Sequence, residues 1–360
     1  MTRSASATRR IIQQTRRIMA TQVDVQVMAP VEKEDAAHAA VFACLEWLEE
    51  VDNRLSRFRA QSELSRLNAS QGEWFSASGL LFEAVEQSLI AAERSGGYFD
   101  PTILPALELL GYDRDFKEIV PAAPVTLPAS TPSRVDWRQV TLDRARRRIR
   151  LAPGIRIDLG GIAKGWAADI ALESFFAGFP NVLINLGGDM RIRGRLGKGE
   201  PWPVGIGNPH DAPTIHAERH VAVLTLARGG LATSGATGRS WYRDGVRQHH
   251  LLDPRTGAPV RLWMGEGDDG ALIASVTAIA PTAAHAEVAT KMALLRGYPE
   301  ALRAVEDAWS ERRSGTVPPA VYDDGQVALL LVLGSGEVVC SAHLPDYLRT
   351  LGGGGNVWVM

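Results

Sequence analysis

The residues best suited to chemistry lie in one short stretch from Ile157 to Asp169, which reads Ile-Asp-Leu-Gly-Gly-Ile-Ala-Lys-Gly-Trp-Ala-Ala-Asp. The pattern predicts a strand that ends at Leu159, a tight turn at Gly160-Gly161 and a helix from Ala163 to about Phe176. Paired glycines let the backbone approach a ligand, and a helix N-terminus with a lysine beside it, here Lys164, attracts anions. A phosphate is the natural ligand. Taken alone, however, the stretch matches neither the dinucleotide fingerprint nor a Walker loop, and it favours an ordinary turn with a solvated lysine.

A second cluster of reactive groups runs from His249 to Gly257, with the sequence His-His-Leu-Leu-Asp-Pro-Arg-Thr-Gly. Its imidazole pair, carboxylate and guanidinium have the chemistry to activate a hydroxyl and to hold a phosphate. The structural alternative is a turn that Asp253 caps and in which Arg255 pairs with that carboxylate. The residues alone favour this alternative.

The elements that must position these groups are predicted from hydrophobic periodicity. Alternation from Thr21 to Met28 indicates a half-buried strand, and apolar residues at three- and four-residue spacing between Glu32 and Leu55 indicate a long amphipathic helix. Ser78 is the expected N-cap of a second helix that runs to Ala92. After the central helix, short apolar segments alternate with glycine and proline. The second half is therefore predicted to be mostly strands, with one late helix from Thr282 to about Leu295.

Composition excludes several classes of function. The chain has 360 residues, of which 45% are hydrophobic and 22% charged, as in globular proteins with a buried core. A formal net charge of -2 gives no electrostatic basis for binding nucleic acid. Residues 2–17 are rich in Arg, Ser and Gln without an apolar run, so we expect no signal peptide, no integral membrane segment and a cytoplasmic location. Cys44 and Cys340 are expected to be core thiols.

Further blocks accompany the two clusters in a fixed order along the chain. They are Ser62-Glu63-Leu64-Ser65-Arg66-Leu67-Asn68, Gly97-Tyr98-Phe99-Asp100-Pro101-Thr102, Asn185-Leu186-Gly187-Gly188-Asp189 and Ala232-Thr233-Ser234-Gly235. Together with Asp158 to Trp166 and His250 to Gly257, these blocks resemble the FAD:protein FMN transferase family, long called thiamine-biosynthesis lipoproteins (ApbE). The resemblance begins near Met19 and fades after about Gly297. Ordered blocks over most of a chain are far more specific than any single motif.

The resemblance implies an α+β fold, namely an ApbE-like (T-fold-like), two-lobed α/β sandwich with mixed, largely antiparallel sheets. We expect residues 1–18 to form a disordered or frayed N-terminal arm, and residues 19–360 to form a single domain built of two interleaved lobes. The implied activity takes FAD, transfers FMN through a phosphoester bond to a Thr or Ser hydroxyl of an acceptor protein, and releases AMP. Two alternatives stay open: an FAD pyrophosphatase that gives FMN and AMP, and a non-catalytic FAD-binding protein.

The resemblance also implies roles for individual residues. His250 is the implied base near the flavin pyrophosphate, and Lys164 is the implied phosphate ligand and second catalytic residue. Phe58 lies where the family has an aromatic residue that stacks on the adenosine, although a loop with one buried phenylalanine is the alternative. The implied FAD contacts are Met19, Phe58, Asn68, Tyr98, Phe99, Asp100, Asp158, Lys164, Thr233, Ser234, His250, Leu252 and Asp253.

Magnesium is the implied metal, and this chain departs from the family at its ligands. The family uses a backbone carbonyl of the glycine turn, here assigned to Gly161, with an Asp and a Thr one turn apart on the late helix. This chain has Glu287 and Lys291 at those two positions. A protonated lysine cannot ligate a hard cation, so either Mg2+ keeps more water or the Lys291 ammonium replaces part of its charge. The plainer interpretation is an exposed salt bridge between residues four apart on a helix.

Overall fold

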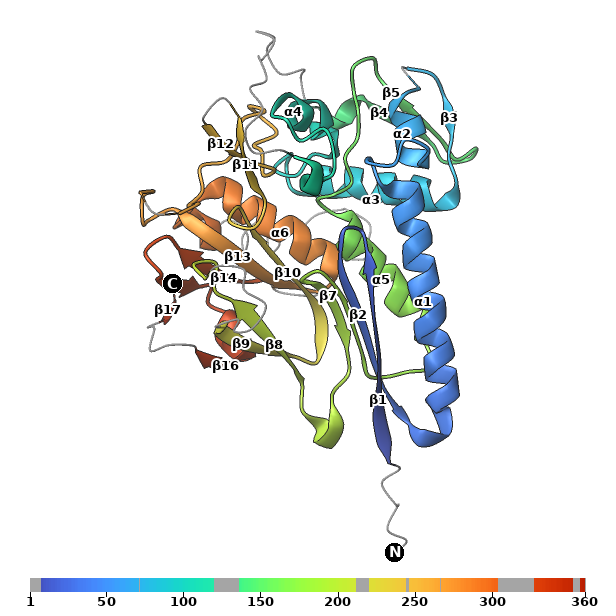
Figure 1. The fold of residues 1–360 in the computed structure, drawn as a ribbon, viewed down its shortest axis with the longest axis vertical. Coiled ribbons are helices and arrows are strands. Elements are labelled where there is room, and N and C mark those ends of the chain that lie inside the picture. Colours follow the sequence, from blue (N-terminus) through green and yellow to red (C-terminus); the bar gives the residue numbers. More distant parts are fainter. Residues whose placement is uncertain are drawn as a thin grey trace, which may run out of the picture.

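The computed structural model describes residues 8–70, 72–119, 136–211, 220–243, 246–265, 267–303, 327–351 and 357–359. Within these residues a nine-stranded sheet runs through the centre of the fold (Figure 1). Its strands, in spatial order, are β1 (Arg9–Ile18), β2 (Thr21–Pro30), β6 (Val182–Leu186), β7 (Asp189–Arg193), β10 (Arg228–Gly235), β13 (Ile273–Ala280), β14 (Ala328–Leu333), β15 (Val338–Cys340) and β17 (Val357–Val359). Neighbours in this described sheet are antiparallel except for the parallel pair β15 and β17. The sheet and its helices confirm the predicted α+β class.

The N-terminal segment corrects one expectation, because residues 9–18 form strand β1 rather than a frayed arm. The strand pairs with β2 along its whole length, and the turn between them, Met19-Ala20, has φ values of 53° and 57°. Positive φ at both positions matches the twist of a tight hairpin. Ile12 is buried in the core, and Arg16 forms an ion pair with Glu46 of the following helix. The polar composition was misleading because part of this strand faces acidic residues of that helix.

Helices cover one face of the sheet, and a small second sheet covers the other. The helices on the first face are α1 (Glu34–Leu55), α5 (Ala163–Phe175) and α6 (Ala283–Arg296) (Figure 1). On the other face the described strands form a sheet in the order β16 (Leu348–Leu351), β9 (His220–Leu226) and β8 (Trp202–Gly207). Alternate residues of the central strands divide between two cores. Ile184 packs with the helical core, and Leu183 packs with Trp202 of the small sheet.

A second group of elements lies beyond one end of α1 and α5 (Figure 1). It contains α2 (Glu63–Asn68), α3 (Gly79–Arg94), α4 (Leu104–Leu109), β3 (Phe75–Ser76), β4 (Val140–Asp143) and β5 (Arg148–Leu151), with the ribbon of β11 (Ser240–Arg243) and β12 (Val246–His249) near α4. Ser78 caps α3 as predicted, since its Oγ accepts a hydrogen bond from the Leu81 N–H at 3.2 Å. Loops from this group reach the predicted glycine turn.

Two glycines bring the late helix against its neighbours. A Cβ placed on Gly165 of α5 would lie 2.6 Å from the backbone of Ala283, and one on Gly230 of β10 would lie 2.2 Å from the Ala283 nitrogen. Only a residue without a Cβ permits such an approach. The first turn of α6 is therefore held against both α5 and the sheet. This contact places Glu287, about one turn further along α6, beside the start of α5.

The predicted strand-rich second half of the chain and its late helix are confirmed. This half is strand-rich, and α6 begins after Thr282, whose hydroxyl accepts a hydrogen bond from the His285 N–H at 3.2 Å. Cys44 and Cys340 are buried free thiols, as expected.

No helix in the described ranges combines the length and apolar character that a membrane span requires.

Candidate functional site

An extended segment leads into the glycine turn, and it is not the strand that the sequence predicted. Residues 155–159 belong to no strand; their backbone bonds instead to a side chain and a loop. The Asn68 amide nitrogen donates to the Ile157 carbonyl at 2.9 Å, and the Asn68 oxygen accepts from the Ile157 N–H at 2.7 Å. The Asp158 N–H donates to the Pro101 carbonyl at 2.8 Å. Asn68, an expected FAD contact, therefore uses its amide to hold this segment.

Asp158, also an expected FAD contact, shapes the turn itself. Its Oδ1 accepts from the Gly160 N–H at 2.5 Å, and its Oδ2 lies 2.8 Å from Nε of Arg57. The two side chains of this ion pair are nearly buried, with 11% of Asp158 and 6% of Arg57 exposed. The pair therefore fixes the backbone of the glycine turn from one side.

Four charged side chains meet at the start of α5. Lys164 Nζ lies 3.1 Å from Glu287 Oε1 and also contacts Asp189 Oδ2. Lys291 Nζ lies 3.3 Å from the same Glu287 oxygen, and Glu287 Oε2 accepts from the Gly165 N–H at 3.0 Å. Only 1% of the Glu287 side chain is exposed, so its pair with Lys291 is not the plain surface salt bridge. We call these two ammonium groups and two carboxylates the charge cluster; their formal charges cancel.

Burial and mutual attraction shift the pKa values within the charge cluster. Burial lowers the pKa of Lys164, but the charges of Asp189 and Glu287 outweigh burial, and the pKa lies above its usual range. Burial raises the pKa of Glu287, yet the charges of Lys164 and Lys291 bring it below its usual value. Burial lowers the pKa of Lys291, and the charge of Glu287 only partly opposes it. Burial raises the pKa of Asp189. Lys164 and Glu287 are therefore firmly charged, whereas Lys291 holds its proton less tightly than an exposed lysine.

Lys291 occupies the place where the resemblance implies a metal. Its Cε lies 3.5 Å from the position of a Cβ on Gly161, so its side chain touches both the glycine turn and Glu287. The Glu287 carboxylate already contacts two ammonium groups and one N–H group. Mg2+ requires about six oxygen ligands in octahedral geometry. In the described part of the chain, no group of three or more His, Cys, Asp or Glu residues has the arrangement to hold a metal ion. The donors present do not fit Mg2+.

The N-terminal N–H groups of α5, which we expected to bind phosphate, are partly used within the protein. Those of Ile162 and Ala163 both donate to the carbonyl of Leu159, and that of Gly165 donates to Glu287. Part of the N–H donors that the sequence suggested for a phosphate at this end of α5 is therefore already used.

His250 directly follows β12 and lies beside a group of aromatic rings. Its ring centroid lies 6.4 Å from that of Tyr112, and its buried Nδ1 has no hydrogen-bond partner among the described residues. Burial, together with the charges of Arg239, His249 and Lys291, lowers the pKa of His250 to about 3. The imidazole is therefore neutral at physiological pH, which is the form that accepts a proton.

Tyr112 is the centre of the aromatic group. Its ring centroid lies 5.7 Å from that of Phe58 and 5.3 Å from that of Trp241, and the Arg57 guanidinium lies 4.5 Å from it. The same guanidinium lies 4.2 Å from the Phe58 centroid, and 41% of Phe58 is exposed. Phe58 is thus not the buried phenylalanine of the alternative interpretation. An exposed ring backed by a cation is a suitable stacking platform.

Tyr98 lies at a second concentration of positive charge. The guanidinium groups of Arg255 and Arg296 lie 4.8 Å and 4.4 Å from its ring centroid. Asp253 accepts from the N–H and the Nε of Arg255, both at 2.9 Å, so the turn with an internal Asp-Arg pair is confirmed. The Asp253 carboxylate is therefore occupied by its neighbour.

The remaining expected contacts make internal bonds or pack in the core. Phe99 and Leu252 are buried, Asp100 accepts from the Thr102 N–H, Thr233 and Ser234 bond through their hydroxyls to those of Thr277 and Thr290, and Met19 lies in the β1–β2 turn. The Ser234 bond, 2.7 Å long, links β10 to α6 one residue before Lys291. The strand therefore reaches the edge of the charge cluster.

Sequence reasoning missed three residues that the fold brings to this site. Asp189 pairs with Lys164, and its place directly after the Gly187-Gly188 turn was a signal that could have identified it. Arg57 and Tyr112 had no comparable signal. They reach the site only because the loops after α1 and α4 fold towards the glycine turn.

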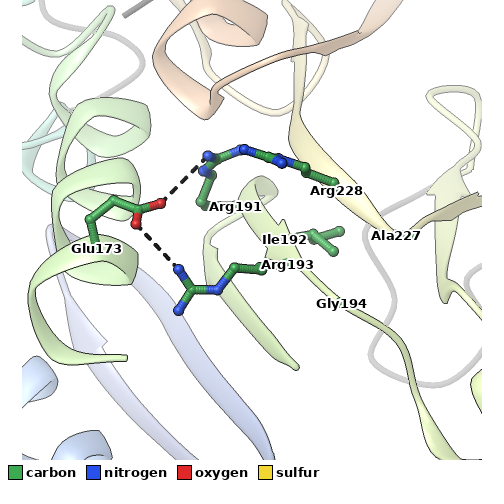
Figure 2. A pocket seen from close by; sticks show the side chains of 7 residues that line it. All are labelled: Glu173, Arg191, Ile192, Arg193, Gly194, Ala227 and Arg228. Atoms are coloured by element: carbon green, nitrogen blue, oxygen red, sulfur yellow. Dashed lines mark hydrogen bonds and ion pairs between the residues drawn. The ribbon is translucent and has the colours of Figure 1, made fainter. Parts of the chain in front are cut away.

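A separate cavity of about 180 Å³ lies between α5 and the strands β7 and β10 (Figure 2). Glu173 lies between two of its arginines, 3.8 Å from Arg191 and 3.2 Å from Arg193. Arg193 also donates to the Phe179 carbonyl at 3.2 Å. The residues that line this cavity include none of the expected FAD contacts. Its ion pairs join α5 to the sheet.

Comparison with known proteins identifies the family of this chain. A family model described as the ApbE family matches residues 19–312. The chain is 31% identical to the FAD:protein FMN transferase of Treponema pallidum over 279 residues. This match covers 72% of each protein. The chain is 27% identical to the FAD:protein FMN transferase of Vibrio cholerae over 216 residues. This match covers 59% of this chain and 63% of the relative. The fold matches a crystal structure of the ApbE protein from Thermotoga maritima with a TM-score of 0.74 and 25% identity, over 95% of this chain and 100% of the other. The chain belongs to the ApbE family.

Proposed function

We propose that the protein transfers FMN from FAD to a Thr or Ser hydroxyl of an acceptor protein and releases AMP. The observation that best supports this proposal is the meeting of a glycine turn, two ammonium groups and a neutral imidazole at Gly161, Lys164, Lys291 and His250. Two relatives bear the name FAD:protein FMN transferase. Phosphoryl transfer depends mainly on positioning and on cationic groups at the phosphate oxygens, and the glycine turn and the two ammonium groups suit these roles.

In the proposed reaction, the acceptor hydroxyl attacks the phosphorus atom of the FMN half of the pyrophosphate. The new P–O bond forms as the bond to the bridging oxygen breaks, and AMP leaves with that oxygen. The hydroxyl proton passes to the His250 imidazole and then to solvent. Ammonium groups at the site offset the charge on the phosphate oxygens.

A pKa of about 3 makes His250 a weak base before FAD binds. The charges of Arg239 and Lys291 contribute to that low pKa. An anionic pyrophosphate beside them offsets both charges, so the pKa of His250 rises in the complex. This rise moves the imidazole towards the range in which general bases act.

Two aromatic residues support the proposed recognition of FAD. The exposed Phe58 ring, with Arg57 behind it, is the proposed platform for the adenine. Tyr98, with Arg255 and Arg296 against its ring, is the proposed contact of the flavin nucleotide. The distribution of cations over both places suits a ligand with a central pyrophosphate.

Because the donors at Glu287 and Lys291 do not fit Mg2+, the proposed reaction has no step through that ion. Two finer expectations stay predictions. The cytoplasmic location is testable by fractionation of cells that make the protein. The division of residues 19–360 into two interleaved lobes is testable by limited proteolysis.

The deciding experiment is incubation of purified protein with FAD and a lysate of the native host. AMP and free FMN are separated by chromatography, and covalent flavin is read as fluorescence on a denaturing gel. AMP with a fluorescent protein band is the expected result. AMP and free FMN without a band would indicate the pyrophosphatase, and FAD binding without AMP would indicate the non-catalytic protein.

A further inference from the structure

We propose that the Lys291 ammonium is the fixed cation of the pyrophosphate site, and that this protein binds and cleaves FAD without a divalent metal ion. The inference rests on the proposed function and makes Lys291 a catalytic residue in contact with the phosphate oxygens. Lys164 is paired with both carboxylates of the charge cluster and therefore contributes less to the charge on the phosphate than Lys291 does.

The position of Lys291 supports this role. Its side chain touches the Gly161 position through Cε, and its Nζ lies 3.3 Å from Glu287. Its charge also acts on His250, where it contributes to the lowered pKa. One ammonium group therefore lies beside the turn and the carboxylate, and its charge acts on the imidazole that the proposed reaction requires.

Lys164 and Lys291 differ in how much of their N–H donor capacity remains available to a ligand. An ammonium group has three N–H donors. Lys164 is paired with both Asp189 and Glu287. For Lys291, Glu287 is the one hydrogen-bond or ion-pair partner found among the described residues, and 17% of the side chain is exposed. Lys291 therefore keeps more donor capacity for a bound anion than Lys164 does.

Charge balance also favours an ammonium group over a dication. Lys164 and Lys291 together balance Asp189 and Glu287. A divalent cation added to this neutral and largely buried cluster would leave an excess of two positive charges that no carboxylate of the cluster balances. Without the charge of Lys291, however, the cluster would have an excess of one negative charge, which an added cation would offset. Removal of this one ammonium should therefore create a need for metal that the wild-type protein lacks.

Rigid elements hold the Lys291 side chain in place. The first turn of α6 is packed against Gly165 and Gly230, and Thr290, next to Lys291, bonds to Ser234 of β10 at 2.7 Å. A charge fixed before the substrate arrives needs no reorganisation during the reaction. A built-in cation of this kind can take over the electrostatic part of a metal ion's work.

The test compares AMP release from FAD, with a dialysed lysate of the native host as the source of acceptor protein, in EDTA and in increasing Mg2+ for wild type, Lys291→Thr and Lys291→Arg. The wild-type rate should differ by less than about twofold between the two buffers, and Lys291→Thr should lose about a hundredfold in EDTA, as for a deleted oxyanion donor. Added Mg2+ should restore part of that loss in Lys291→Thr. Lys291→Arg keeps the charge and should stay independent of metal. Arg144→Thr, which removes an exposed ion pair with Glu86, is the matched control and should behave as wild type.

A wild-type rate that EDTA abolishes and Mg2+ restores would overturn the inference, as would identical Mg2+ curves for wild type and Lys291→Thr. The comparison of the wild-type rates in EDTA and in Mg2+ tests the inference even if the variants do not fold. If no AMP forms in either buffer, the proposed function fails, and FAD binding, followed by flavin fluorescence, tests the cation role separately. Wild-type affinity should then be the same in both buffers, and Lys291→Thr should bind about tenfold more weakly in EDTA, as for a lost charged hydrogen bond. Wild-type affinity that requires Mg2+ would overturn the inference.

Discussion

Replacing Gly165 with alanine should force apart the two helices that build the charge cluster. At most helical sites this change stabilises a protein by about 1 kcal/mol, because alanine has the better helix propensity. Here the new Cβ would lie 2.6 Å from the carbonyl carbon and oxygen of Ala283 and from the nitrogen of Ala284. These are backbone atoms of α6, which cannot rotate away as a side chain can. The helix itself must move.

The expected magnitude follows from that displacement. Carbon atoms pack at about 3.5–4.0 Å, so the two backbones must separate by about 1 Å. Overpacking costs about 1–3 kcal/mol, which exceeds the gain in propensity, and we expect the free energy of unfolding to fall by up to about 2 kcal/mol. The same shift lengthens the 3.0 Å bond from the Gly165 N–H to Glu287. A displacement of about 1 Å in a catalytic site costs about a hundredfold in rate, and AMP release should fall accordingly.

Urea unfolding and AMP release, measured for wild type, Gly165→Ala and Gly79→Ala, check this reasoning. Gly79 is the matched control because it begins helix α3 and a Cβ there would meet no atom within 4 Å. Alanine at Gly79 should leave stability unchanged or raise it by up to about 1 kcal/mol. Equal effects of the two substitutions on unfolding would refute the packing argument. Lost stability with full AMP release in Gly165→Ala would refute the link between this helix contact and the charge cluster.

Three smaller perturbations test the base, the ligand preference and a buried carboxylate. His250→Ala should lower AMP release by about a hundredfold to ten-thousandfold with little change in FAD affinity, and unchanged turnover would return His250 to a structural role. FAD should bind more tightly than FMN or riboflavin in a fluorescence titration, because Phe58 and the charge cluster act together; equal affinities for FAD and riboflavin would contradict this. Asp169 accepts from the Ala283 N–H at 2.9 Å, and burial raises its pKa from 3.8 to about 6. The folded state therefore binds this proton more tightly than the unfolded state, and the associated stability is lost as pH rises from about 4 to about 6. Urea unfolding should show the stability of wild type relative to Asp169→Asn falling by up to about 3 kcal/mol over that range, and a constant difference would count against the assignment.

Local sequence pattern was sufficient to predict those elements whose structure depends on near neighbours in the chain. Alternation predicted β2 because successive side chains of a strand point to opposite faces. The spacing of apolar residues predicted α1, and Ser78 predicted the start of α3, because a cap bonds within the first turn. The ordered motif blocks predicted the family. These features require no knowledge of what packs against them.

Packing between distant segments determined the rest. Strand β1 has few apolar residues, and its pairing with β2 and its contacts with α1 made it a strand. Residues 155–159 look like a strand in the sequence, but the Asn68 side chain satisfies the Ile157 backbone and no ladder forms there. Each outcome depends on which partner satisfies the backbone, and that partner lies far away in the chain.

The Glu287 and Lys291 pair shows most clearly which properties the sequence predicts and which depend on the tertiary structure. Their spacing on one helix predicts that they are neighbours, whether the helix is exposed or buried. Their burial, the second lysine and the bond from the Gly165 N–H come from α5, and Asp189 comes from β7. These distant groups set the pKa values at the site and the poor fit to Mg2+. Neither property follows from sequence spacing, because electrostatic energy depends on the surrounding charges and on solvent exposure.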